Sequence, residues 1–512
     1  MRGRRAGQWR WRLVTLVALT GLGSGAAPLW GQDATWVQTT TVELRDDNRN
    51  GVDLDDRYGV LINRLNFQGH YDKLTASFRA DLFRFWDPPT GDQQNDLLLE
   101  RLTVSYRSGA WTVTAGDFFQ QLGRGIALSL RKVEETGVDV SIQGGRVELS
   151  AGDHQALVFA GRVNAANLDE VSQKRVEDPK DVVTGFSYTW TWLPVATSLF
   201  GVYMETQDEI LGHPGRTATV GGSLELFEIG EWAALYVEGD VQHRESAGVG
   251  CGAFKDPCGG YAGYATLDVY FGSWAWLVEG LYLRGFELRG SRNTALEQAF
   301  VYNLPPTLER VDQELMNQRD VQGVRLHGEV EVAALEMVLA ADFTYRQNDP
   351  GTQAQVDAWH GHGKVQWRHG TGKLWLSGGY REEHSARERL RAMAHGELDW
   401  RQELGGALGL HGYVQHQEEL DATRSGRKGT ALLGLEWRQV GSLTADLGYD
   451  TVNSRAGVRQ WFLAGIATVE LWTSVQARLV AGTQRGGLRC VAGVCRDFPG
   501  FAGARAEVVA RF

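Results

Sequence analysis

Apolar and polar side chains alternate along nearly the whole chain, in segments of about ten residues. Residues 74–82 read LTASFRADL, with the apolar set on one parity, and residues 501–512 place Ala and Val on one parity and Arg505, Glu507 and Arg511 on the other. Successive side chains of a strand point to opposite faces, so each such segment predicts a strand with one apolar and one polar face.

The connectors between these segments alternate in length. Short turns are expected at 108–110, 150–153, 193–194, 229–231, 271–273, 333–335, 369–372, 403–406, 439–442 and 470–472. Longer polar connectors are expected at 46–57, 87–96, 163–181, 207–216, 245–260, 288–320, 347–355, 419–427, 452–457 and 486–499. This alternation is typical of transmembrane barrels, which have tight periplasmic turns and longer outer loops. We therefore predict an all-β fold, a transmembrane antiparallel up-and-down β-barrel of about 24 strands, within a range of roughly 22 to 26.

Composition agrees with a single barrel domain. The residue pattern is uniform from about Trp36 to Phe512, without a hinge or a low-complexity tract. A mean hydropathy of -0.30 excludes a bundle of membrane-spanning helices but allows a barrel, in which half of each strand faces lipid. The net charge of -11 argues against a nucleic-acid binder.

The first 31 residues have the organisation of a secretory signal peptide, with a basic region, a short apolar core at 13–22 and small residues after it. Cleavage is expected between Ala26 and Gln32, and we favour the Gly31–Gln32 bond. The barrel then occupies 32–512. Export also affects the cysteines: Cys251 with Cys258, and Cys490 with Cys495, form two close pairs that predict disulfides in outer loops. Zinc is the alternative, but the spacing fits it poorly.

Aromatic residues supply two further signals. Trp and Tyr gather near the predicted strand ends, which is expected of interfacial girdles, although β propensity also places aromatics in strands. The final strand ends on Phe512 and resembles the sorting signal of bacterial outer-membrane barrels. That resemblance implies barrel-assembly machinery and outer-membrane lipid as partners.

Two motifs suggest metal binding. Asp46, Asn48, Asn50 and Asp53 lie in DDNRNGVDLDD, which opens like a Ca2+ loop of the EF-hand kind. Arg57 stands where the loop needs a bidentate Glu, so a solvated acidic loop is the alternative. His360 and His362 form a His-x-His pair without a visible third ligand, and polar filling of the lumen explains them better. No other cofactor is expected.

Residues 116–132, GDFFQQLGRGIALSLRK, do not fit the strand cadence. They predict a loop folded into the lumen or an extra hairpin. Together with RDDNRNGVDLDDRYG, this run resembles a family of large bacterial outer-membrane barrels, porin-like and uncharacterised, over roughly the first third of the mature chain. The family offers no activity to carry over. In the long connector 288–320, either of the pieces 294–302 and 308–316 is compatible with a short helix, and the connector is expected to constrict the mouth, to dock a partner or to form a mobile lid without specific function.

The inward faces of the predicted strands carry charges of both signs, which predicts weak ion selectivity or internal ion pairs. The predicted pore-lining residues are Arg79, Asp81, Arg101, Arg325, Glu329, Glu331, Asp342, Arg346, Glu436, Arg438, Arg505 and Glu507.

These features predict a bacterial outer-membrane channel, porin-like, for small polar solutes. The alternative is a non-catalytic scaffold that sheathes or anchors a partner protein of a secretion, surface or electron-conduit complex. The chain has no GxSxG, HExxH or P-loop motif, so we expect no enzyme, and an outer-membrane hydrolase is the weakest reading. A barrel this wide needs filling, and a separate N-terminal plug domain, as in TonB-dependent receptors, is not expected.

Overall fold

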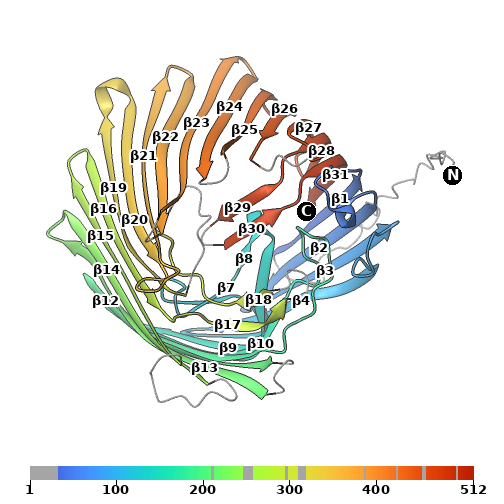
Figure 1. Cartoon of the computed structure of the whole chain (residues 1–512). Coiled ribbons are helices and arrows are strands. Elements are labelled where there is room, and N and C mark those ends of the chain that lie inside the picture. The colour runs from blue at the N-terminus through green and yellow to red at the C-terminus, as the bar shows by residue number, and fades with distance from the viewer. Residues whose placement is uncertain are drawn as a thin grey trace.

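The computed structural model describes residues 33–208, 213–245, 258–293, 298–309, 319–385, 388–421, 425–452, 457–491 and 494–512. The predicted signal peptide and Cys251 lie outside these ranges. The described strands form one closed antiparallel barrel with a wall of 24 strands, as the alternation predicts (Figure 1).

The wall strands follow one another around the barrel in chain order. They are β1 (Asp33–Arg45), β2 (Gly59–Tyr71), β3 (Leu74–Trp86), β4 (Asp96–Ser108), β5 (Trp111–Phe118), β9 (Val138–Ala151), β10 (His154–Ala165), β11 (Val182–Trp192), β12 (Val195–Asp208), β13 (His213–Ile229), β14 (Ala233–Glu245), β15 (Gly259–Phe271), β16 (Trp274–Arg284), β19 (Val321–Val332), β20 (Met337–Asn348), β21 (Val356–His369), β22 (Gly372–Ser385), β23 (Arg389–Gly405), β24 (Leu408–Asp421), β25 (Ser425–Trp437), β26 (Gly441–Asp450), β27 (Trp461–Trp472), β28 (Val475–Gln484) and β31 (Phe501–Arg511).

The barrel closes where β31 pairs with β1, in a register that puts Glu43 opposite Arg505 and Thr41 opposite Glu507. Trp36 and Phe512 exchange two backbone hydrogen bonds of 2.9 and 3.0 Å, and their rings meet edge to face with centroids 5.8 Å apart. The start of β1 and the end of β31 therefore lie at one rim, which we call the turn rim.

The eleven short turns also lie at the turn rim, because each follows a strand that returns to the side of Trp36. The predicted turns are confirmed, and the turn at 72–73 between β2 and β3 was missed. The long connectors, also as predicted, lie at the opposite rim, called here the loop rim. The up-and-down order produces this division, since every second connector returns to the same side, and the even number of wall strands puts both ends of the wall at the turn rim.

The outer face of the wall is apolar and exposed. Leu433, Leu463 and Leu479 are 59%, 63% and 51% exposed, although such side chains are normally buried in a water-soluble fold. Trp111, Trp192, Trp232, Trp274 and Trp437 are exposed at or beside the short turns, where an interfacial girdle is expected. This belt is the surface that a barrel presents to lipid.

Three segments leave the wall and enter the barrel (Figure 1). We call them the inserted segments, and each joins two neighbouring wall strands at the loop rim. Their elements are β6 (Gln120–Leu122), β7 (Leu128–Leu130), β8 (Lys132–Val133) and the 3-10 turn η3 (Glu134–Thr136) in the first, β17 (Arg289–Asn293) and β18 (Gln298–Val301) in the second, and β29 (Gly487–Val491) and β30 (Val494–Phe498) in the third. Two other 3-10 turns are η2 (Asp53–Asp55) and η4 (Ala333–Leu335).

These segments confirm one prediction and correct another. Residues 116–132 form an extra hairpin, β6 with β7, folded into the lumen. The helix expected over 294–302 is wrong at 298–301, which pair as strand β18 with β17 because the hairpin is completed by its own backbone hydrogen bonds. The second expected helix, at 308–316, falls mostly outside the described residues.

Candidate functional site

The lumen has two unlike halves. From β9 to β12, and again on β15 and β16, the inward side chains are largely apolar and are covered by the inserted segments, whereas β13 and β14 bury polar groups such as Thr219, Glu238 and Asp240. From β20 to β25 the inward side chains are largely charged, imidazole or amide groups, among them Asp342, His360, Arg381, His395 and Gln417. An apolar wall must be covered by protein, whereas a polar wall is stable against water.

The apolar half is a true hydrophobic core inside the barrel. Leu128, Leu130 and Tyr302 of the inserted segments are fully buried against Ile142 and Phe200 of the wall. Burying each such side chain contributes about 1.5–3 kcal/mol, so these contacts alone hold the first and second inserted segments firmly against the wall.

Asp181 is a polar anchor within this core. Its carboxylate is 0% exposed and accepts hydrogen bonds from the Ser291 backbone N–H (2.8 Å), the Tyr302 hydroxyl (2.6 Å) and the Ser291 hydroxyl. Burial, with the neighbouring Asp181 charge, raises the pKa of Tyr302 well above its ordinary value, so this hydroxyl stays a donor. The connector before β11 thus binds both ends of the β17–β18 hairpin.

A second contact joins the same inserted segment to the polar wall. The Glu309 carboxylate lies 2.6 Å from His360 Nδ1 on β21, and His360 Nε2 lies 2.8 Å from His395 Nε2 on β23. Burial raises the pKa of Glu309, but the His360 hydrogen bond and the nearby charges of Arg381 and Arg346 outweigh it and leave this pKa below its ordinary value. Glu309 is therefore docked as a carboxylate.

This contact makes docking of the segment depend on pH. A carboxyl group with a lowered pKa stabilises the docked form above its ordinary pKa of 4.5 and loses that contribution as pH falls through the lowered value. We expect channel openings to become more frequent below about pH 4, and Glu309→Gln to show them already at pH 7. A charge-assisted hydrogen bond is worth about 1.5–3 kcal/mol, or roughly a tenfold to hundredfold change in the docking equilibrium.

Bilayer recordings from about pH 3 to about pH 7, a range that spans the titration of carboxyl groups, measure this effect. Glu287→Gln is the matched control, because Glu287 lies in the same segment and its carboxylate has no partner among the residues described. Identical pH profiles for Glu309→Gln, Glu287→Gln and the unmodified protein would contradict the docking role.

The predicted pore-lining residues separate by depth. Arg79 contacts Asp81 at 2.5 Å and Asp139 at 2.6 Å, and Arg101 also contacts Asp139. A second buried network joins Arg325 to Glu279 and Asp342, each at 2.5 Å. These charges form internal ion pairs in the middle of the lumen and in its half nearer the loop rim.

Towards the turn rim the inward charges are exposed. Glu329, Glu331, Glu436 and Arg438 are all exposed, and Arg438 pairs with Glu403 beside a short turn. At the seam Arg505 contacts Glu43 at 2.6 Å, and Glu507 lies opposite Arg478 in the register. Arg346, by contrast, is 7% exposed, and its Nη2 has no hydrogen-bond partner among the described residues. That these groups line a conducting pore stays a prediction.

Four important polar residues were missed by the sequence analysis: Asp139, Asp181, Glu279 and Glu309. Glu279 has the inward parity of Leu281 and Leu283 on β16 and was accessible to a stricter count of alternation, whereas Asp139 has the parity opposite to the inward Ile142 of β9 and was not. Asp181 and Glu309 lie in connectors, where no local pattern distinguishes an anchor from a solvated carboxylate.

The predicted calcium loop is held by its own hydrogen bonds. Asn48 and Asn50 each donate a side-chain N–H to Asp55 at 2.9 Å, and their oxygens accept backbone N–H groups of Asn50 and Val52. Asp46 accepts from the Asp47 backbone, and Asp53 lies in η2. No group of three or more His, Cys, Asp or Glu side chains in the described ranges is arranged to hold a metal ion, His360 and His362 included. The calcium site stays a prediction.

The cysteine pairs also stay predictions. Cys490 and Cys495 lie directly opposite each other across the β29–β30 hairpin, a backbone arrangement compatible with a disulfide. Cys258 lies next to β15, and its predicted partner falls outside the described residues.

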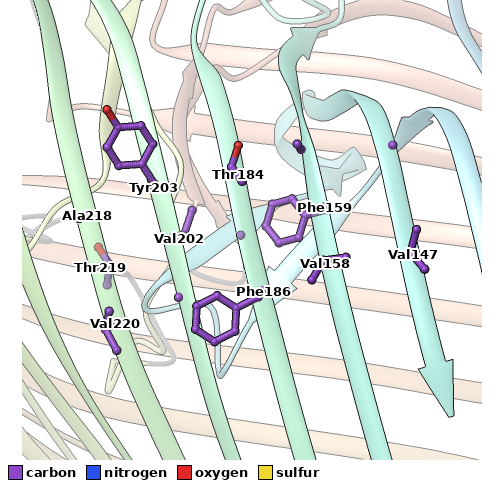
Figure 2. A pocket seen from close by; sticks show the side chains of 14 residues that line it. Val147, Val158, Phe159, Thr184, Phe186, Val202, Tyr203, Ala218, Thr219 and Val220 are labelled. Carbon is purple, nitrogen blue, oxygen red and sulfur yellow. The ribbon is translucent and has the colours of Figure 1, made fainter.

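An apolar hollow of about 630 Å3 crosses β9 to β13 (Figure 2). Val158, Phe186, Tyr203 and Val220, which line it, are 40–55% exposed on the outer face of the wall. Small residues such as Gly201 leave the hollow between them, so it belongs to the lipid-facing belt and not to the lumen. In the described part of the chain, no helix is long and apolar enough to cross a membrane.

No protein-family model matches the chain, and no curated protein matches it. Solved structures do resemble its fold. The siderophore receptor PirA from Pseudomonas aeruginosa superimposes with a TM-score of 0.50 at 8% identity, over 94% of this chain and 81% of that one. A mutant of the ferric enterobactin receptor PfeA from the same organism gives 0.49 at 9% identity, over 94% and 81%. Pseudomonas aeruginosa OccK5 gives 0.39 at 12% identity, over 71% and 95%.

At such identities the likeness to PirA concerns the fold alone. It agrees with what the structure shows directly, a closed barrel with an apolar outer belt, aromatic groups at the turn rim and polar groups inside. The chain is a bacterial outer-membrane β-barrel protein.

Proposed function

We propose that this barrel is a channel for small polar solutes, narrowed from the loop rim by its own inserted segments. The observation that carries the proposal is the asymmetry of the lumen. Inserted segments pack on the largely apolar inward side chains of β9 to β12, β15 and β16, while the inward side chains from β20 to β25 are largely polar. These polar side chains are buried at His360 and Arg381 but exposed towards the turn rim, where they are suited to a water-filled path for polar solutes.

The exposure of the inward charges supports a lumen that widens from the loop rim towards the turn rim. They are buried in networks in the outer half and exposed near the turn rim, at Glu329, Glu331 and Glu436. The narrow part thus lies towards the loop rim and opens into a wider chamber on the side of the termini. Mixed charges in this chamber favour weak ion selectivity.

Swelling of proteoliposomes in sugars of increasing size tests the proposal. We expect the smallest sugars to enter faster than into protein-free vesicles, with the rate falling steeply as the solute grows. Vesicles that contain heat-unfolded protein are the control. Swelling no faster than in protein-free vesicles for every solute would contradict a channel.

We propose further that the barrel-assembly machinery recognises the last strand. β31 closes the wall and ends beside Phe512, whose exposed ring meets Trp36 at the turn rim. The scaffold function is the second candidate, distinguished by co-purification of a stoichiometric partner. It is less well supported, because inserted segments of the chain itself occupy one half of the lumen. We propose no catalytic role.

A further inference from the structure

A polar pocket of about 330 Å3 opens at the loop rim, away from the charge networks described above. Three connectors build it: the one between β1 and β2, the one between β26 and β27, and the start and end of the third inserted segment. Phe462, which points inward from β27, forms part of its floor. A solute that approaches the mouth of the barrel meets this pocket before the narrow part of the lumen.

Three arginines converge on the pocket, one from each connector: Arg49, Arg459 and Arg485. None of them forms an ion pair with a carboxylate among the described residues. Arg459 Nε is buried and has no hydrogen-bond partner there. The Arg459 backbone N–H donates to the Arg49 carbonyl at 3.0 Å, which fixes two of the three connectors side by side.

Two carboxylates lie beside this group. Asp450 and Asp497 line the same pocket, so three arginines face two carboxylates among its lining residues. Asp450 accepts a hydrogen bond from the Val452 backbone N–H at 2.9 Å, and Asp497 is exposed at the edge. A half-buried guanidinium without a partner loses solvation without compensation, which a bound anion would restore.

We propose that this pocket binds a small soluble anion with two carboxylate or phosphate charges, as the entry subsite of the channel. Guanidinium groups offer forked pairs of N–H donors that match carboxylate and phosphate oxygens, and three of them favour a doubly charged ligand over a singly charged one. A volume of about 330 Å3 is near the lower end for ligand pockets, which limits the ligand to a few carbon atoms. This inference rests on the proposed function for its role in transport, but not for binding itself.

Titration calorimetry of the folded protein in a neutral detergent tests the site. The probes are succinate and inorganic phosphate as dianions and acetate as the monoanion, at low and fixed chloride. We expect both dianions to bind more tightly than acetate, and Arg459→Gln with Arg485→Gln to weaken succinate binding by roughly tenfold to hundredfold. Arg57→Gln is the matched control, because Arg57 lies on the β1–β2 connector outside the pocket and pairs with Asp47 at 3.2 Å.

If Arg57→Gln weakened succinate binding as much as the pocket substitutions do, the binding would be due to general surface charge, and the proposed site would be wrong. Binding of a phosphate-bearing lipid in mixed micelles, with no binding of free phosphate or succinate, would overturn the soluble ligand. Because calorimetry needs no transport, the two proposals fail separately. If the barrel conducts ions but binds no dianion, the proposed subsite is wrong. If it does not conduct but binds succinate, the proposed channel is wrong and the binding site stands.

Discussion

Replacing Asp181 with asparagine is expected to release the second inserted segment from the wall and to give the barrel large, fluctuating conductance. The native carboxylate accepts hydrogen bonds from Ser291 and Tyr302 while it is fully buried. Asparagine has only one acceptor oxygen. Its amide group also points two N–H donors at the Ser291 and Tyr302 groups, which are themselves donors to Asp181. Loss of two charge-assisted hydrogen bonds costs about 3–6 kcal/mol of docking free energy, which is enough to populate the undocked form.

Single-channel recording of Asp181→Asn measures this release. Asp178→Asn is the matched control, because Asp178 lies on the same connector but accepts from the Ala165 backbone at 3.2 Å and not from the inserted segment. If Asp181→Asn recorded the same current traces as Asp178→Asn and the unmodified protein, the inserted segment would not control the opening.

The second large effect concerns the stability of the wall. Arg325 holds two buried carboxylates, Glu279 on β16 and Asp342 on β20, at 2.5 Å each. Arg325→Gln removes the guanidinium that both carboxylates share, while Tyr264 still donates to Glu279 at 2.7 Å and His327 lies 3.0 Å from Asp342. Breaking a buried pair in this way costs about 3–5 kcal/mol, so we expect a correspondingly lower free energy of unfolding in urea.

Arg427→Gln provides the comparison, because the Arg427–Glu418 pair has a similar distance of 3.0 Å but its side chains are 65% and 40% exposed. Exposed pairs contribute about 0–1 kcal/mol. Unfolding curves for the two variants that agreed within about 1 kcal/mol would show that the Arg325 network does not stabilise the barrel.

The wall could be predicted from sequence because its signals are local. Residues 74–82 alternate, a polar connector begins within a few residues of their end, and each strand needs only its two neighbours to satisfy its backbone. The alternation is weaker over residues 273–287, for a physical reason that only the structure reveals. In β16 the inward residues Leu281 and Leu283 are apolar because an inserted segment covers them, while Tyr282 is apolar because it faces lipid.

The interior could be predicted only in part. The hairpin within 116–132 was expected because it broke the strand cadence, and the network charges Arg79 and Arg325 because they lie on the polar parity of their segments. The anchors Asp181 and Glu309 join segments 110 and 51 residues apart along the chain. No periodicity within either segment records such a contact, which depends on how the inserted segment folds back across the lumen.

The central claim is that a polar path through the barrel is narrowed by segments of the chain itself. Single-channel conductance of the refolded protein in a planar bilayer, with and without the segment 288–320, tests it most directly. We predict small or rare steps from the intact protein and large, steady steps after the deletion. Silence of both proteins, under conditions where circular dichroism shows a folded barrel, would contradict the claim and leave the scaffold as the better account.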